Sequence, residues 1–301
     1  MEKKRFAGHS AILIANTLFG FGVPVSKLLL DKWVTPMGYM ASRSFFAALI
    51  FWVIAMFMPK EKVERRDLII ILLGGVMGFV ISQTLTAWAL VYTTPTYYSM
   101  VAALVPVIVM LLAALFIGEK ITLLKFIGVV VGITGTLLMV LKVGDNGSGR
   151  NDMLGILLTL LSAVTWGVYL IITRKVSDKY TPVTQMKWVF LISAVITVPW
   201  ALLGDGLDPL YTSAVELSGV LEMAFIVVCC TVLGYFLIPY AMKYIGATTV
   251  SVYTNLQTIV ASFVAIIIGQ DIFSWDKPVA LVLVLLSAYI VNVAASRQSK
   301  G

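Results

Sequence analysis

The chain has few charged residues, and this scarcity excludes a soluble fold. Asp, Glu, Lys and Arg make up 12% of its 301 residues, while 60% are apolar and the mean hydropathy is +0.98. An ordinary soluble domain is roughly 25% charged. Because 22 basic and 15 acidic side chains cannot cover the water-exposed surface of a chain of this length, the sequence predicts an integral membrane protein whose solvent is the lipid bilayer.

Cysteine and histidine are also scarce, and no acidic residue lies near the centre of an apolar segment. Cys229 and Cys230 are adjacent in one apolar run, which gives neither a disulfide framework nor a metal site. The one histidine, His9, is expected in the first turn of the first helix. Hydrolytic or transfer chemistry needs a nucleophile with a base, or a metal cluster. We therefore expect no catalytic residue, metal or cofactor, and an intramembrane enzyme is the least favoured alternative.

The net charge of +7 does not indicate a nucleic-acid partner, because the basic residues form short runs between apolar segments and no basic stripe. Sixteen Lys and Arg residues fall on one side of the expected membrane and five on the other. By the positive-inside rule, the N- and C-termini and the loops 59–67 and 176–183 are cytoplasmic. The loops 143–152 and 204–217 then face outward, and the expected location is the cell (inner) membrane.

Ten segments approach the 20 or so apolar residues that a spanning helix needs. Three of them begin at Thr-Pro pairs, which place a capping hydroxyl before a proline at the first helical position: Thr35-Pro36, Thr94-Pro95 and Thr181-Pro182. The connections are too short for a separate soluble domain. The expected spans are 7–30, 36–58, 68–91, 95–116, 122–142, 153–175, 184–203, 218–242, 247–268 and 275–296.

The sequence also repeats itself. Gly8 to Gly20 matches Gly155 to Gly167 at an offset of 147, so that Phe19 pairs with Trp166. Each copy holds five expected spans, and because five is odd the second copy must enter the membrane from the opposite side. We predict an all-α integral membrane fold of ten transmembrane helices, built as two inverted five-helix repeats over 1–150 and 151–301.

Four motifs follow one another in a fixed order: Phe/Trp-Gly in the first helix, Arg43 in the second, Gly118-Glu119-Lys120 at the end of the fourth, and a glycine-rich fifth. This pattern resembles the ten-helix EamA branch of the drug/metabolite transporter superfamily. The second copy departs from it at Gly269-Gln270-Asp271, so no role that needs a carboxylate in both copies carries over. The resemblance implies a central cavity lined mainly by helices 1, 3, 4, 6, 8 and 9, and transport of amino acids, other metabolites, sugars, nucleotides or drugs.

Arg43 is a charged residue inside a span, roughly 10 Å from the outer edge at 1.5 Å per residue. Its repeat partner lies near Val189, which is apolar, so the repeat does not require a cation there. Three roles fit an intramembrane arginine: binding a substrate carboxylate, closing a gate against backbone carbonyls, or snorkelling to the interface.

Side-chain amides and aromatic rings mark a candidate substrate site. An amide in hydrocarbon is costly without a partner, so the amides must face other helices or a water-filled cavity. None of them has an amide at its repeat partner, which favours a site for an asymmetric molecule over bonding common to both halves. The aromatic residues are either packing or cavity walls. The candidate residues are Asn16, Phe19, Gln83, Trp166, Tyr169, Tyr235, Tyr253, Asn255 and Gln257, with Arg43 on the outer side.

The function predicted from these features is secondary-type transport of small organic metabolites by alternating access around a midplane cavity. The lack of an intramembrane carboxylate argues against cation/proton antiport and favours a neutral, zwitterionic or mildly anionic substrate. Export of amino acids or related compounds is the most favoured activity, and a passive channel-like facilitator is the alternative.

Overall fold

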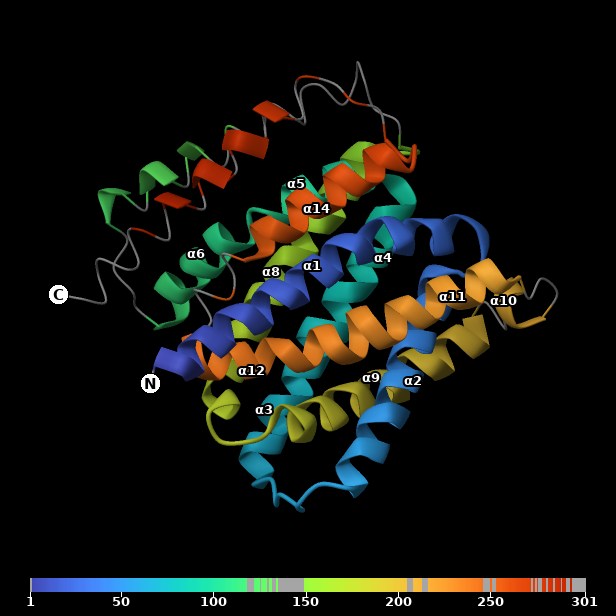
Figure 1. The fold of residues 1–301 in the computed structure, drawn as a ribbon, viewed down its shortest axis with the longest axis vertical. Coiled ribbons are helices and arrows are strands. Elements are labelled where there is room, and N and C mark those ends of the chain that lie inside the picture. The colour runs from blue at the N-terminus through green and yellow to red at the C-terminus, as the bar shows by residue number, and fades with distance from the viewer. Residues whose placement is uncertain are drawn as a thin grey trace.

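Every element that the described residues form in the computed structural model is a helix (Figure 1). Among the described residues, seven helices are long and apolar enough to cross a membrane, and each agrees with a predicted span to within three residues at both ends. The predicted span 247–268 is represented by a shorter apolar helix, Leu256–Ile267. The spans 122–142 and 275–296 lie only in part within the described residues. Those residues are 2–117, 122–124, 126–128, 130–131, 134, 149–204, 208–212, 216–245, 250, 253–271, 273, 275, 278–279, 281–283, 285–287, 289–290 and 293.

The long helices begin at the residues that their sequences mark as caps. The Thr35 hydroxyl accepts a hydrogen bond from the Gly38 N–H at 3.1 Å, and the Thr94 and Thr181 hydroxyls make the equivalent bonds at 3.3 Å. The predicted Thr-Pro starts are therefore confirmed. In chain order the helices are α1 (Glu2–Lys32), α2 (Pro36–Met56), α3 (Arg65–Gly75), η1 (Val76–Ile81), α4 (Ser82–Tyr92), α5 (Pro95–Ala102), α6 (Val105–Ile117), α8 (Asp152–Ser177), α9 (Pro182–Gly204), α10 (Pro209–Thr212), α11 (Leu217–Phe225), η2 (Ile226–Gly234), α12 (Tyr235–Ile245) and α14 (Thr254–Ile267).

Two of the spans carry a π-helical segment in their middle. The helix α3–η1–α4 contains η1, and α11–η2–α12 contains η2, with wider turns than an α-helix. The two segments are equivalent in the repeat, because a shift of 151 positions moves η1 onto residues 227–232, which lie within η2. Since π-helical turns are frequently found at functional sites, their position next to the centre of the molecule points to that region.

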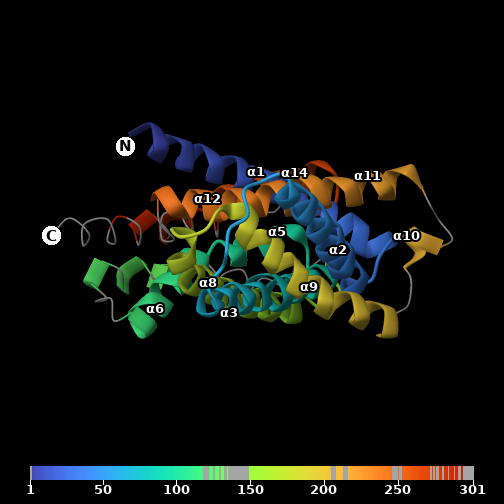
Figure 2. The ribbon, with the colours of Figure 1, turned by 90° about the horizontal axis from the view of Figure 1, so that it is seen from below.

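The helices form two layers (Figure 2). In one layer α1 packs against α14 and α11–η2–α12, and in the other α8 packs against α3–η1–α4 and α3 packs against α9. The last residues of α1 and the first residues of α8 lie at the same end of the molecule, because Lys27 Nζ donates to the Leu90 carbonyl at 2.7 Å and the Asn151 N–H to the Tyr92 carbonyl at 2.9 Å. The helices α1 and α8 therefore run in opposite directions.

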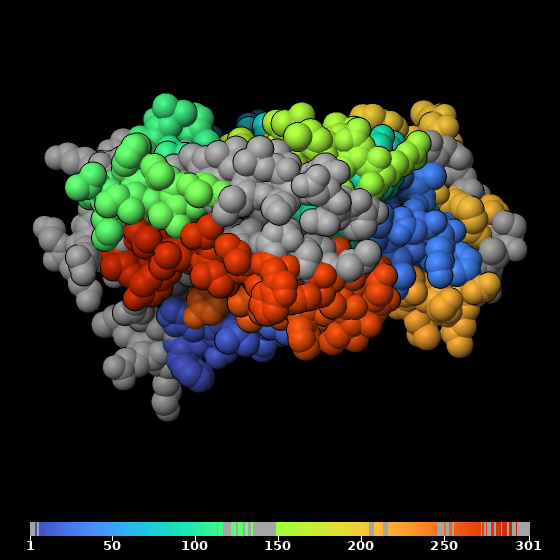
Figure 3. Space-filling model, turned by 90° about the horizontal axis from the view of Figure 1, so that it is seen from above, coloured from blue at the N-terminus to red at the C-terminus, as the bar shows by residue number. Residues whose placement is uncertain are grey.

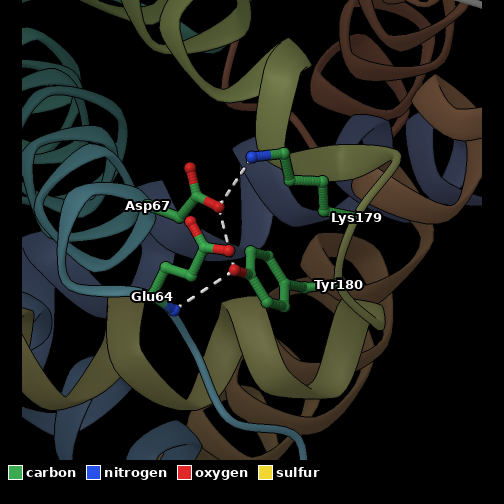
Figure 4. Close-up of polar contacts among 4 residues, drawn as sticks. All are labelled: Glu64, Asp67, Lys179 and Tyr180. Atoms are coloured by element: carbon green, nitrogen blue, oxygen red, sulfur yellow. Dashed lines mark hydrogen bonds and ion pairs between the residues drawn. The ribbon is translucent and has the colours of Figure 1, made fainter.

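Polar contacts tie the connections together at both ends of the molecule. At the end that we name the Asp67 end, the Asp67 carboxylate accepts hydrogen bonds from Lys179 Nζ at 2.9 Å and the Tyr180 hydroxyl at 2.8 Å, while the Glu64 N–H donates to that hydroxyl at 3.2 Å (Figure 4). At the other end, the Asp208 end, the Asp208 carboxylate accepts from the Thr35 N–H at 2.8 Å.

The surface is apolar, as a lipid-facing protein requires. Large side chains such as Leu115, Leu203 and Phe263 are exposed. Figure 3 shows described residues that follow α14, in red, lying beside described residues that follow α6, in green. The Ser287 hydroxyl donates to the Gly128 carbonyl at 2.6 Å, which joins the two segments.

Candidate functional site

A cavity of about 110 Å³ lies between the two layers. One water molecule needs about 10–15 Å³ by the same kind of measure, so the space accommodates a small organic molecule. Its lining comes from α1, α2, α4, α5, α6, α8, η2, α12, Val250 and α14. The predicted spans 1, 3, 4, 6, 8 and 9 all contribute, and α2 joins them through Tyr39 and Arg43.

Arg43 is the charged group of this cavity. Its side chain is 4% exposed, so it does not snorkel to the interface. Nε donates to the Thr231 hydroxyl at 2.9 Å, and Nη1 donates to Gln83 Oε1 at 3.1 Å and to the Tyr39 hydroxyl at 3.3 Å. These acceptors are side-chain oxygens from three helices rather than backbone carbonyls, so Arg43 links α2 to α4 and η2.

The acceptors are themselves held in place. Tyr39 and Ser26 hydroxyls lie 2.6 Å apart, and Ser26 donates to the Gly22 carbonyl at 2.7 Å. Since Ser26 has used its proton, the Tyr39 hydroxyl donates to Ser26 and keeps its lone pairs for Arg43. Thr231 likewise donates to the Ile226 carbonyl at 2.8 Å, within the π-helical segment η2, and accepts from Arg43. The guanidinium is therefore positioned by an ordered network.

A second polar group lines the cavity from α4, α5 and α8. The Ser162 hydroxyl lies 3.0 Å from that of Ser82 and 2.9 Å from that of Thr86, and the Thr86 hydroxyl lies 3.4 Å from that of Tyr98. All four side chains are neutral and buried. They supply hydrogen-bonding capacity without charge.

Aromatic rings close the remaining wall. Tyr235 is the central ring: it makes edge-to-face contacts with Phe19, Phe79 and Trp166, with ring centroids 5.3–5.9 Å apart. Geometry of this kind adds about 0.5–1.5 kcal/mol per pair beyond burial. The rings also bring the repeat-related Phe19 and Trp166 to one wall.

Seven of the ten candidate residues line the cavity: Asn16, Phe19, Arg43, Gln83, Trp166, Tyr235 and Gln257. Asn16 is 2% exposed and donates through Nδ2 to the Ile12 carbonyl at 2.9 Å, which fixes the amide in the wall.

The other three candidates are placed differently. Tyr169 is buried beside the cavity, with its ring 4.9 Å from that of Trp166, and it is not a lining residue. Tyr253 precedes α14 instead of lying within a helix, and its hydroxyl pairs with His9 Nδ1 at 2.9 Å. The Asn255 side chain lies outside the described residues, as does the Gly118-Glu119-Lys120 motif.

Sequence reasoning missed the hydroxyl residues of the wall. Ser and Thr are common in membrane helices, where many donate to the carbonyl four residues earlier, so composition alone does not single them out. Spacing holds one signal: Tyr39 and Arg43, and likewise Ser82 and Thr86, are four apart and share a helix face.

Charged groups at the Asp67 end have shifted pKa values. Burial raises the pKa of the Glu61 carboxyl, but hydrogen bonds from Thr184 and Thr181 outweigh it and hold this pKa below its ordinary 4.5. The hydrogen bond to Asp67 and the charge of Asp67 raise the pKa of the Lys179 ammonium. Both groups are charged at neutral pH, so their contacts persist there.

The comparison with protein families decides what kind of protein this is. The model of the EamA-like transporter family matches the chain twice, over residues 6–141 and 153–293. The chain belongs to the EamA-like transporter family. The EamA match also supports membership of the drug/metabolite transporter superfamily, as the motif order suggested.

Two of the relatives of this EamA protein are named as transporters and a third is named as WAT1-related. An uncharacterized transporter of Archaeoglobus fulgidus is 22% identical over 93% of this chain and 97% of its own length, and the uncharacterized transporter YyaM of Bacillus subtilis is 24% identical over 84% and 83%. A WAT1-related protein of Arabidopsis thaliana is 25% identical over 89% and 86%. A solved crystal structure with 17% identity superposes with a TM-score of 0.68 over 99% of each chain, which shows a shared fold. The protein is therefore a multi-pass membrane transporter of the EamA type.

Proposed function

We propose that this EamA protein is a secondary-type transporter that exports amino acids or related small metabolites across the cell membrane by alternating access. The observation that carries the proposal is the cavity between the layers, which both matched segments line with polar and aromatic side chains. A site of this kind near the middle of a helical bundle is typical of transporters built from two repeats.

Paired contacts support an inverted repeat. A Cβ at Gly8 on α1 would lie 3.1 Å from the Tyr244 Cβ on α12, and a Cβ at Gly155 on α8 would lie 2.5 Å from the Thr93 Cβ at the end of α4. The two pairs are equivalent in the repeat, because Gly155 follows Gly8 by 147 positions and Tyr244 follows Thr93 by 151 positions. Because α1 and α8 are antiparallel, the two pairs lie at opposite ends of the molecule, as a two-fold axis in the membrane plane would place them.

Each end also carries one equivalent carboxylate contact. At the Asp208 end the Asp208 carboxylate accepts from the Thr35 N–H, and at the Asp67 end the Glu61 carboxylate accepts from the Thr181 N–H at 3.1 Å and the Thr181 hydroxyl at 2.9 Å. Thr35 and Thr181 are the caps of the second helix in each repeat. Asp208 follows α9, the second helix of the second repeat, and contacts the start of α2, the second helix of the first repeat. Glu61 in turn follows α2 and contacts the start of α9.

These contacts suit a rocking motion. Opening one end requires the loss of its carboxylate contact, whereas the contact at the other end stays formed. The π-helical segments η1 and η2 lie where the spans must bend, and their widened turns provide places for that bending. In this proposal the Asp67 end is cytoplasmic and the Asp208 end faces outward.

Uptake of a radiolabelled metabolite panel into proteoliposomes tests the proposal. We expect uptake of amino acids or related solutes above that of empty liposomes, with saturation at increasing concentration. A variant with Asn16→Ala and Gln257→Ala should lower apparent affinity, and Leu203→Ala on the exposed surface of α9 is the matched control. Saturation distinguishes a carrier from the alternative of a channel-like facilitator. Lack of uptake of every solute by reconstituted, folded protein would refute the transport proposal.

A further inference from the structure

The charge of the cavity is unbalanced. Among the described lining residues Arg43 alone carries a formal charge, and no Asp or Glu is present. No carboxylate in the described part of the chain forms an ion pair with its guanidinium. A guanidinium stays protonated at any physiological pH, so the cavity wall has a permanent positive charge.

The described groups that contact Arg43 are all neutral. Thr231, Gln83 and Tyr39 accept three hydrogen bonds, the Tyr235 hydroxyl is a further electrostatic neighbour, and the Tyr39 and Phe79 rings lie about 5 Å from the guanidinium carbon. Neutral acceptors and ring faces make burial of the cation tolerable, but they do not neutralise it. The missing counter-charge can therefore come from a molecule in the cavity.

We propose, on the basis of the proposed transport function, that the substrate carries a carboxylate and that Arg43 is the residue that binds it. Arg is well suited to this task, since in its planar fork Nε and Nη1 make the three bonds described above and the two N–H groups of Nη2 remain to donate charge-assisted hydrogen bonds to a carboxylate. The network through Thr231, Tyr39 and Ser26 fixes the orientation of the fork. Gln83, whose Oε1 already accepts from Arg43, carries an amide N–H₂ beside the same position.

The other residues of the cavity wall indicate the chemistry of the substrate beyond its carboxylate. Phe19, Trp166 and Tyr235 offer an apolar surface for a ring or a branched aliphatic group. The remaining polar groups that we described are amides and hydroxyls, so the described wall holds no carboxylate to match an ammonium group. An α-amino group is therefore accepted but not required, and the carboxylate is the group on which binding depends.

The test uses four ligands that differ only at two groups: 3-phenylpropionate, phenylalanine, 3-phenylpropionamide and phenylalaninamide. A second set with an aliphatic body, from 4-methylpentanoate to leucinamide, covers the alternative shape. Binding to purified full-length protein is measured by calorimetry and by the shift in melting temperature. We expect the carboxylic acid of at least one of the two sets, aromatic or aliphatic, to bind. The corresponding amide should bind roughly 10- to 100-fold more weakly, because a hydrogen-bonded ion pair is replaced by a neutral contact. Removal of the amino group should change affinity less than threefold.

Variants assign the preference to Arg43. Arg43→Gln should abolish the acid-over-amide preference while leaving amide binding within a few-fold, and Arg43→Lys should retain part of it because the charge remains without the fork. Arg174→Gln, at an exposed helix end, is the matched control and should change nothing. If Arg43→Gln does not fold, the ligand comparison on the unaltered protein still decides the matter.

Four results would overturn the proposal: no carboxylate binds, acid and amide bind equally, the preference survives in folded Arg43→Gln protein, or chloride alone stabilises the protein as much as the acids do. Transport gives an independent outcome. A protein that carries neutral solutes with no acid preference would refute the role of Arg43 and keep the transport proposal. A protein that binds acids but moves no solute would keep the role of Arg43 and refute the transport proposal.

Discussion

Removal of the end contacts should shift the protein between its two open states in opposite directions. In Glu61→Ala the Thr181 N–H and hydroxyl lose their charged acceptor, and in Asp208→Ala the Thr35 N–H loses its acceptor. A hydrogen bond to a charged group contributes about 1.5–3 kcal/mol when buried. Because Glu61 is partly exposed, solvent screening reduces this to roughly 1–2 kcal/mol, which is about a 5- to 30-fold change in the ratio of the two states.

The thiol of Cys230 reports this ratio, because it lines the cavity and is buried in the wall. In a Cys229→Ala background, we expect Glu61→Ala to speed labelling by an impermeant thiol reagent from the Asp67 end, and Asp208→Ala to speed it from the Asp208 end. Oriented membrane vesicles separate the two sides. Glu64→Ala is the control, because the Glu64 carboxylate makes no hydrogen bond that holds that end together. If both variants speed labelling from the same side, or neither changes it, the end contacts do not govern access.

Three further predictions concern the topology, the substrate affinity and the helix packing. A cysteine at position 147 should react with an impermeant reagent in intact cells, whereas one at position 62 should be protected; the opposite pattern would reverse the topology. Asn16→Ala or Gln257→Ala should each weaken substrate affinity several-fold, since one hydrogen bond contributes about 0.5–1.5 kcal/mol, and unchanged affinity in titrations would remove that amide from the site. Gly78→Ala should lower the melting temperature, because its Cβ would lie 2.4 Å from Tyr169 Cγ and overpacking costs roughly 1–3 kcal/mol; an unchanged melting temperature would show that α8 can move away.

The span boundaries were predictable because lipid imposes a minimum apolar length and the Thr-Pro caps mark where helices begin. The π-helical segments were not predictable, since η1 and η2 consist of the same apolar residues as the helices around them. Their extra turn width depends on packing against neighbouring helices.

The cavity was predictable only in part. An amide, an arginine or a midplane ring in a span stands out from its apolar neighbours, and seven of the ten residues chosen in this way line the cavity. The partner of Arg43 at Thr231 lies 188 positions away and is brought near by packing of η2 against α2. Tyr253 lies just before α14, and its hydroxyl pairs with His9 and does not line the cavity.

The central claim is that one cavity carries a substrate to either side in turn. Counterflow tests it most directly: proteoliposomes are loaded with an unlabelled substrate identified by the metabolite panel, and entry of a labelled trace is followed without any ion gradient. The account predicts transient accumulation of the label above its external concentration, with a rate that saturates. Equilibration without overshoot at every internal concentration would contradict alternating access and indicate a passive pathway.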